Sequence, residues 1–296
     1  MNFFLTDGDN LSLTACYNNF IKNKSEVLVK QLIFFNQLCS MTIIDTHCHL
    51  YSEELLNDIE QLMERAATAG VQKFYLPAID SETTDAMLSL EQRFPGKCFA
   101  MMGLHPCSVK ENYKDELEKI KTWLDKRKFA AVGEIGLDFY WDKTFTKEQF
   151  AAFHLQIDWA LQYNLPIVIH TREAMDETIA VVKEYAGKGL KGIFHCFGGS
   201  YENAMEIINA GFYLGIGGVL TYKKSGLDAV LSKISLDHMV LETDAPYLTP
   251  VPFRGKRNES SYLKYIIEKL AEVKGTTVED VAAITSANAE KIFALK

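Results

Sequence analysis

The segment MTIIDTHCHL, residues 41–50, decides the fold prediction because it joins a strand pattern to two candidate metal ligands. Its apolar and β-branched residues, 42–45, are typical of a strand buried on both faces of a parallel sheet. Side chains alternate between faces in an extended strand, so we expect His47 and His49 to project together and Cys48 to point away. Two imidazoles on one face can form half of a divalent metal site, although a His-x-His pair alone is a weak signal.

The same alternation of a short apolar run and an amphipathic helical pattern continues along the rest of the chain. Candidate strands occupy residues 42–45, 73–77, 98–103, 130–134, 166–170, 192–195, 212–215 and 239–242. Helical patterns include 53–69 and 146–163, and Thr146 and Gln149 have the spacing of a capping box. Eight such units fit the roughly 250 residues of a TIM barrel. The sequence therefore predicts an α/β fold, a single-domain (β/α)₈ TIM-type barrel at residues 41–296 with extra C-terminal helices.

The net charge, the lack of long apolar runs and the scattered cysteines narrow the class of protein. Residues 1–40 carry no chemical motif, so either Met41 is the real start or these residues are a specific N-terminal extension. The net charge of −8 argues against a protein that coats duplex DNA, but not against an enzyme that releases its product. The chain has no long apolar run, no secretion signal and six scattered cysteines. We therefore expect a cytoplasmic protein with reduced thiols and no membrane partner, and a monomer by default.

Further histidines and carboxylates fall at the ends of other predicted strands. These are Glu134 after the fourth, His170 after the fifth, His195 after the sixth and Asp244 after the eighth. The carboxyl ends of barrel strands converge on one mouth, so these four are expected to meet His47 and His49 there. Six donors exceed the needs of one tetrahedral ion but suit two ions that share a bridging carboxylate.

The predicted order around the barrel suggests how the donors divide. Glu134 lies between the two groups and is the expected bridge. The first and eighth strands are neighbours in a closed barrel, so His47, His49 and Asp244 are expected to serve one ion. His170 and His195 are expected to serve the other ion. Asp244 is also a candidate acceptor for the proton of an attacking water.

These residues carry a resemblance: the chain is similar to TatD-family metal-dependent deoxyribonucleases, a branch of the amidohydrolase-like barrels. The matching segments follow the family's order and are DTHCHL (45–50), GLHP (103–106), GEIGLD (133–138), LPIVIHTR (165–172), HCFGGS (195–200), ETDAPYLTP (242–250) and RGKRNE (254–259). Residues 1–40 are extra relative to the family, and Ser260 stands where proline usually follows the last motif.

The resemblance implies a function and a cofactor. It implies two divalent ions on the six donors, hydrolysis of ester bonds, and 3′–5′ exonuclease action on DNA, either single-stranded or at duplex ends. It favours Mg²⁺ for activity, whereas histidine-rich ligation favours Mn²⁺ or Zn²⁺. The sequence leaves the metal, the polarity of digestion and the choice between DNA and RNA open.

Three weaker candidates could contact substrate. His105 in GLHP could bind a phosphate or simply lie at the rim, and Arg172 could bind a phosphate or form a structural ion pair. Arg254, in a basic loop after the last strand, could contact the nucleic-acid backbone or be a solvated charge. Asp138 could orient a ligand or cap a turn. The aromatic residues Phe139, Tyr140, Trp141 and Tyr247 could stack bases, although packing is the commoner role.

Two alternative functions remain at this stage. The first is a small-molecule amidohydrolase or esterase in the same barrel. Such relatives typically bridge their metals with a carboxylated lysine, and Glu134 at the bridging position favours phosphodiester hydrolysis instead. The second is a non-catalytic metal-binding scaffold, for which a lost donor would be expected, and no donor is missing.

Overall fold

The computed structural model describes residues 41–294, and the predicted extension at residues 1–40 lies outside them. All eight predicted strands are present and all pair in parallel, in two arcs ordered β1-β2-β3 and β4-β5-β6-β7-β8. Their bounds are β1 Ile43–Asp45, β2 Val71–Pro77, β3 Cys98–Met101, β4 Val132–Asp138, β5 Ile167–Arg172, β6 Gly192–Phe194, β7 Phe212–Ile216 and β8 Met239–Leu241.

Backbone hydrogen bonds join the two arcs at both junctions. Between β3 and β4, the Met102 amide donates to the Ala131 carbonyl at 3.1 Å, and the Gly133 amide donates to the Met102 carbonyl at 3.0 Å. Between β8 and β1, the Thr46 amide donates to the Leu241 carbonyl at 3.0 Å. The chain therefore folds as the predicted (β/α)₈ barrel, and each strand is followed by helical structure.

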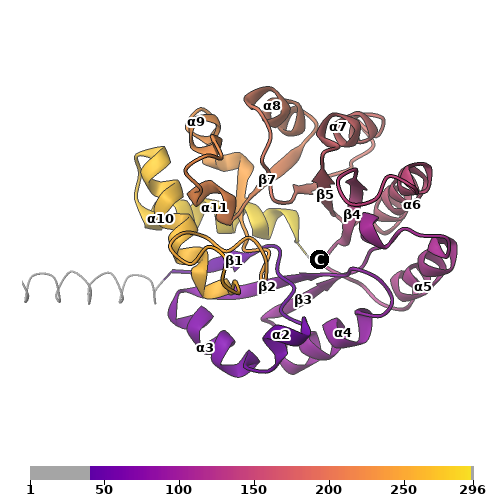
Figure 1. Cartoon of the computed structure of the whole chain (residues 1–296), viewed down its shortest axis with the longest axis horizontal. Coiled ribbons are helices and arrows are strands. Elements are labelled where there is room, and N and C mark those ends of the chain that lie inside the picture. Colours follow the sequence, from indigo (N-terminus) through magenta and orange to yellow (C-terminus); the bar gives the residue numbers. More distant parts are fainter. Residues whose placement is uncertain (1–40, 295–296) are drawn as a thin grey trace, which may run out of the picture. The chain divides into compact units, whose positions relative to one another are not determined.

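The helices surround the strands, as Figure 1 shows. They are α2 Glu53–Leu56, α3 Ile59–Thr68, α4 Thr84–Arg93, α5 Tyr113–Lys126, α6 Thr146–Tyr163, α7 Met175–Lys183, α8 Tyr201–Asn209, α9 Leu227–Leu231, α10 Leu263–Lys274 and α11 Val278–Ile292, with short 3₁₀ turns η1 Pro106–Ser108, η2 Gly218–Thr221, η3 Leu236–His238 and η4 Ser260–Tyr262. Of the last two helices, α10 follows β8 and completes the eighth unit, and α11 is the predicted C-terminal addition.

Two local predictions were wrong for identifiable reasons. The helical pattern at 53–69 is interrupted at Asp58, whose backbone leaves the helical region while its carboxylate binds Arg257 at 2.8 Å. The Thr146–Gln149 capping box does not form. The Gln149 side chain instead bonds the backbone amide and carbonyl of Asp138, at 2.9 and 3.1 Å. Gln149 thus anchors α6 to the end of β4.

Inside the barrel, an apolar layer lies beneath the polar residues predicted to form the site. A cluster of buried side chains joins nearly every strand to the end of α11, where the rings of Tyr75 and Phe293 stack 3.8 Å apart. Val168 belongs to this layer, and His170 is two residues further along β5. Because residues two apart in a strand share a face, His170 also points into the barrel, one layer nearer the carboxyl ends.

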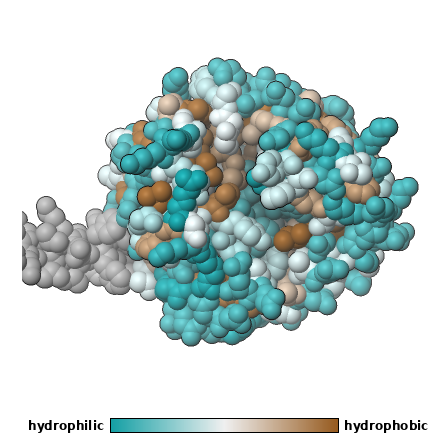
Figure 2. Space-filling model, viewed as in Figure 1, coloured by the Kyte–Doolittle hydropathy of each residue, from teal (hydrophilic) through white to brown (hydrophobic). Residues whose placement is uncertain are grey.

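The outer surface is largely polar. Figure 2 shows hydrophilic residues over much of the rim, with hydrophobic residues gathered nearer the middle of the same face. Cys48, Cys98, Cys107 and Cys196 are free thiols. Across residues 41–294, no helix combines the length and apolar character needed to cross a bilayer.

Candidate metal centre

His47 and His49 lie in the loop that follows β1, just beyond the end of the predicted strand at residues 42–45. Their Nε2 atoms nevertheless approach the same carboxylates, while the Cys48 thiol points away to the Tyr75 carbonyl. The loop is fixed by Asp45, which is fully buried and accepts hydrogen bonds from the Thr243 amide at 3.0 Å and from the Ser260 hydroxyl at 2.6 Å. These bonds tie the first donor segment to the last one.

Tyr51 positions the ring of His49. The Tyr51 hydroxyl donates to the Pro77 carbonyl, so it accepts from His49 Nδ1, which lies 2.9 Å away. A neutral imidazole with its proton on Nδ1 has its lone pair on Nε2. That atom faces Asp244 Oδ1 at 3.5 Å and Glu134 Oε2 at 3.7 Å. Since a lone pair facing carboxylate oxygens is unfavourable by itself, this arrangement fits a cation between them.

Glu134 occupies the centre of the donor cluster. It lies within β4 instead of at its end, because the strand continues to Asp138. Oε2 is 3.1 Å from His47 Nε2, whereas Oε1 is 2.9 Å from His170 Nδ1. Its two oxygens therefore face two different groups of imidazoles. Close packing of β4 on β5 requires Gly136, where a Cβ atom would lie 2.0 Å from the His170 carbonyl oxygen.

His170 is held from both sides. Its Nε2 lies 2.9 Å from Asp138 Oδ2, and Asp138 Oδ1 accepts from the amides of Tyr140 and Trp141 at 3.0 Å each. Asp138 thus fills both roles weighed for it, orienting a histidine and capping the turn after β4. His105 lies 3.2 Å from His170 Nδ1 and 3.5 Å from Glu134 Oε1, which places it among the donors and not at the outer rim.

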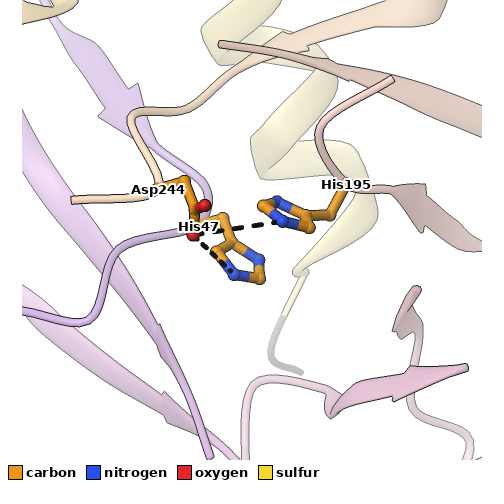
Figure 3. A group of neighbouring side chains, drawn as sticks. All are labelled: His47, His195 and Asp244. Atoms are coloured by element: carbon orange, nitrogen blue, oxygen red, sulfur yellow. Dashed lines mark ion pairs between the residues drawn. The ribbon is translucent and has the colours of Figure 1, made fainter. Parts of the chain in front are cut away.

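His195 lies between the two groups. Its ring stacks on that of His47 with centroids 3.6 Å apart, and the Asp244 carboxylate faces both rings (Figure 3). His195 Nε2 is 3.7 Å from Glu134 Oε1 and 4.0 Å from Asp244 Oδ1. The expected division of the donors between two ions therefore changes in two details. His195 adjoins His47 and Asp244 as well as Glu134 Oε1, and His105 lies with His170 and Glu134.

The buried carboxylates and imidazoles of the cluster shift one another's pKa values. Burial would raise the pKa of Glu134, yet the surrounding histidines, His47 first, hold it well below its usual range. Burial lowers the pKa of His47, as does the neighbouring His195. Burial would also lower the pKa of His195, but Glu242, Glu134 and Asp244 outweigh it and raise the pKa to about 10. In the metal-free protein, protons on imidazoles thus balance buried carboxylates.

The donor set fits divalent ions on three grounds. Within residues 41–294, His47 Nδ1 is buried without a hydrogen-bond partner, which is costly unless another group satisfies it, and His47 Nε2 faces the carboxylates of Glu134 and Asp244. His49 Nε2 faces two carboxylates, at 3.5 and 3.7 Å. Imidazole nitrogens and carboxylate oxygens are ligands of Zn²⁺ and Mn²⁺, and the carboxylates also suit Mg²⁺. Four groups among the described residues offer ligand atoms within 4.8 Å of one another: His47, His49, Glu134; His47, His195, Asp244; His105, Glu134, His170; and His195, Cys196, Glu242.

The two predicted substrate-binding arginines are exposed and stacked on aromatic rings. Arg172, at the end of β5, lies 3.8 Å from the ring centre of Tyr140 and 5.2 Å from that of Trp141. Tyr140 is 49% exposed and Trp141 67% exposed. Arg254 lies 4.2 Å from the ring centre of Tyr222. The predicted structural ion pair of Arg172 is not seen among the described residues.

Other predicted candidates divide between substrate-facing and structural positions. Arg257, from the same basic loop as Arg254, forms an ion pair with Asp58 and is structural. Phe139 packs against Phe150. Tyr247 is 53% exposed, and its ring lies 6.1 Å from that of His49. Tyr247 therefore borders the donors, as the base-stacking prediction requires.

The sequence reasoning missed two buried groups that set the geometry. Tyr51 positions His49, as described above. Glu242 lies 2.9 Å from His195 Nδ1 through Oε1, and Gly215 makes room for it, since a Cβ there would lie 2.3 Å from Glu242 Oε2. Both residues have a signal in the sequence, because each lies two positions from a donor, Tyr51 after His49 and Glu242 before Asp244.

Comparison with known proteins gives one consistent result. The family model described as "TatD related DNase" matches residues 44–294. The "uncharacterized metal-dependent hydrolase YabD" of Bacillus subtilis is 38% identical, with 85% of this chain and 98% of that protein covered. The "3′-5′ ssDNA/RNA exonuclease TatD" of Pectobacterium parmentieri is 31% identical, with 86% and 100% covered. The crystal structure of YjjV, a TatD homologue from Escherichia coli K12, superposes with a TM-score of 0.81 at 30% identity, with 86% and 98% covered.

Proposed function

This chain belongs to the family of TatD-related DNases, and we propose that it is a metal-dependent hydrolase of phosphodiester bonds that digests nucleic acid from the 3′ end. One observation carries the proposal: the two oxygens of the buried Glu134 carboxylate face separate groups of imidazoles. This is the arrangement that a carboxylate shared by two ions requires.

We assign the ions to the donors described above. His47, His49 and Asp244 would hold one ion. His170 and His195, whose nitrogens both face Glu134 Oε1, would hold the other, although His195 also adjoins His47 and Asp244. Glu134 would be shared between the two ions. Bound divalent ions would supply Lewis acidity to the phosphodiester and lower the pKa of a water molecule toward neutrality. We propose Mg²⁺ for activity, with Mn²⁺ or Zn²⁺ able to occupy the same donors.

The protein side chains have separate tasks in this proposal. Asp244 is the most accessible carboxylate of the cluster, with its side chain 14% exposed against 2% for Glu134. Burial would raise the pKa of Asp244, but the nearby His195 and His49 keep it below its usual value. Asp244 is therefore ionised at neutral pH and can accept the proton of the attacking water. Asp138 fixes the ring of His170 from outside the cluster.

The surroundings of the cluster support a nucleic-acid substrate. Arg172 lies two residues beyond His170, and its guanidinium is stacked on exposed aromatic rings instead of being bound to a carboxylate. A stacked arginine can bind a phosphate oxygen while the neighbouring rings stack an unpaired base. The similarity to a protein named as a 3′–5′ exonuclease of single-stranded DNA and RNA supports this polarity and an unpaired end.

The alternative functions have less support. An amidohydrolase of the kind weighed above would place a lysine where Glu134 lies. A scaffold without activity would tolerate the loss of a donor, and all six predicted donors are present and clustered. We therefore rank phosphodiester hydrolysis first.

The decisive experiment is digestion of end-labelled single-stranded DNA, duplex DNA and RNA by metal-stripped protein to which Mg²⁺, Mn²⁺ or Zn²⁺ is returned. We expect a ladder that shortens from the 3′ end only when metal is present. The Asp244→Asn variant should lose this activity, because it keeps the shape of the side chain but removes the proton acceptor.

Two results would contradict the proposal. If no nucleic acid is cut with any of the three ions, the substrate is a different ester or amide. If Asp244→Asn digests DNA as fast as the unmodified protein does, a contaminating nuclease or another site is responsible. The matched control is Asp237→Asn, an exposed carboxylate in η3, before the start of β8 and thus at the opposite end of the barrel.

A further inference from the structure

A second feature lies on the loops that follow β7 and β8. It is a pocket of about 540 Å³. Its lining residues are Val219, Thr221, Tyr222, Lys223, Lys224, Ser225, Val251 and Arg254. Both loops leave the carboxyl ends of their strands, so the pocket belongs to the same mouth of the barrel as the donors.

The walls of this pocket are fixed by hydrogen bonds between the two loops. The Thr221 hydroxyl accepts from the Val251 amide at 2.9 Å. The Tyr222 hydroxyl donates to the Thr249 carbonyl at 3.0 Å. Arg254 lies over the ring of Tyr222 and is held in place by that contact. The pocket is therefore a formed feature of the fold and not a gap between independent loops.

Its charge is positive and uncompensated. Lys223, Lys224 and Arg254 are exposed, and none of them pairs with a carboxylate of residues 41–294. Elsewhere on the described surface many basic side chains do pair, such as Arg93 with Glu60. Three free cations in one pocket of a chain whose net charge is −8 favour an anionic ligand.

Exposed side chains occur along the loop from the donors to the pocket, with the buried Thr249 and Pro250 between Leu248 and Val251. Asp244 contacts His47 and His49, and Tyr247 borders the ring of His49. Further along the same loop, Leu248 is 37% exposed and Val251 is 46% exposed, and Val251 lines the pocket. A single strand has unpaired bases and a charged backbone. Exposed aromatic and apolar side chains suit the bases, and the free cations of the pocket suit the backbone.

We propose that this pocket binds the sugar–phosphate backbone of the nucleic-acid strand at nucleotides beyond the bond that is cut. The inference rests on the proposed function and deepens it, because it makes a strand of several nucleotides, and not a single nucleotide ester, the preferred substrate. Lys223 and Lys224 neutralise phosphates of the strand, and Arg254 contacts one more while it remains stacked on Tyr222. The remaining apolar wall accepts a sugar or a base.

The test compares the Lys223→Ala/Lys224→Ala variant with the unmodified metal-loaded protein on two substrates. One is a twelve-nucleotide single strand, and the other is the small diester bis(p-nitrophenyl) phosphate, which can occupy the metal centre alone. We expect the ratio of kcat/KM on the strand to kcat/KM on the diester to fall about tenfold. For the strand, the slope of log KM against log salt concentration should fall by about 1.4. This is roughly 0.7 for each of the two lost phosphate contacts.

The matched control is Lys188→Ala/Lys191→Ala. It removes the same charge from the loop before β6, at the opposite end of the barrel. An unchanged substrate ratio and salt dependence in the Lys223/Lys224 variant would overturn the proposed pocket while leaving the metal centre intact. An equal effect in the control would also overturn it, because the effect would then come from net charge. If the unmodified protein cuts neither substrate, the proposed function itself fails.

Discussion

Replacement of Glu134 by glutamine tests the shared carboxylate most directly. The amide keeps the size and shape of the side chain, which is 2% exposed and surrounded by imidazoles. It removes the negative charge that Oε2 presents to His47 and that Oε1 presents to His170. Because one residue serves both groups, a single substitution should weaken both metal sites together.

The size of the effect follows from this double role. Loss of a residue that only orients a metal ligand lowers metal affinity about 10–100-fold. A shared direct ligand should cost at least about 100-fold at each of the two sites, or about 5.6 kcal/mol in total. Turnover should fall about 10³-fold or more, because the ions supply several kcal/mol of transition-state stabilisation.

The assay is metal content after stripping and reloading, measured by elemental analysis beside turnover on single-stranded DNA. We expect about two ions per chain in the unmodified protein and fewer than one in Glu134→Gln. Glu118→Gln, an exposed carboxylate on α5, is the control and should match the unmodified protein. Full loading of Glu134→Gln with two ions, or turnover within about threefold of normal, would refute a shared carboxylate.

Three further predictions concern the residues around the cluster. Asp138→Asn should weaken metal binding about 10–100-fold by releasing the ring of His170, and a chelator competition assay would measure it. The pKa of His195 is raised to about 10 in the metal-free protein, so an ion that binds this imidazole must displace a proton. Metal affinity should therefore rise by up to about tenfold for each pH unit between pH 6 and pH 8. Proton release on metal addition would be recorded calorimetrically in buffers of different ionisation enthalpy, and its absence would contradict this. Trp141→Ala should raise KM for single strands by roughly tenfold through lost stacking, with little change for bis(p-nitrophenyl) phosphate.

The strands of the barrel could be predicted because their signal is local. Each is a short apolar run between turn and helix patterns, and a run of this kind can adopt few structures other than a buried strand. All eight expected strands are present, with bounds that shift by a few residues. The largest shift is at β4, which was expected to end at Glu134 and continues to Asp138. Pairing with β5 as far as Arg172 accounts for the extension, and that pairing is a long-range contact.

The donors could be expected to cluster because barrel topology brings strand ends together. The donors cluster although their positions relative to the strand ends differ: His47 and His49 lie beyond β1, and Glu134 and His170 lie within β4 and β5. Clustering requires only that each residue lie near the carboxyl end of its strand and point inward. Both conditions follow from the order of the strands and the alternation of side chains, and neither depends on knowing which atoms meet.

The residues that orient the donors could not be found in the same way. Gln149 matched a helix cap in the sequence, but in the structure it binds the backbone of Asp138, eleven residues away. Gln156, also on α6, bonds the backbone amide of Leu104 at 2.7 Å, next to His105. An amide side chain satisfies whichever backbone groups the packing of the helix leaves within reach, so its partner is fixed only when the helix has docked on the strands.

The placement of His105 shows where prediction from the sequence stops. The GLHP motif located His105 at the mouth of the barrel, but not whether it faced substrate or metal. In the structure its Nδ1 accepts from the Cys107 amide at 3.0 Å, which leaves Nε2 to face Glu134 and His170. With Nδ1 acting as acceptor, a neutral ring carries its proton on Nε2 and can donate it. His105 is therefore suited to hold a carboxylate or a phosphate oxygen at the second group, and this choice of nitrogen depends on a turn, η1, that no pattern in the sequence specifies.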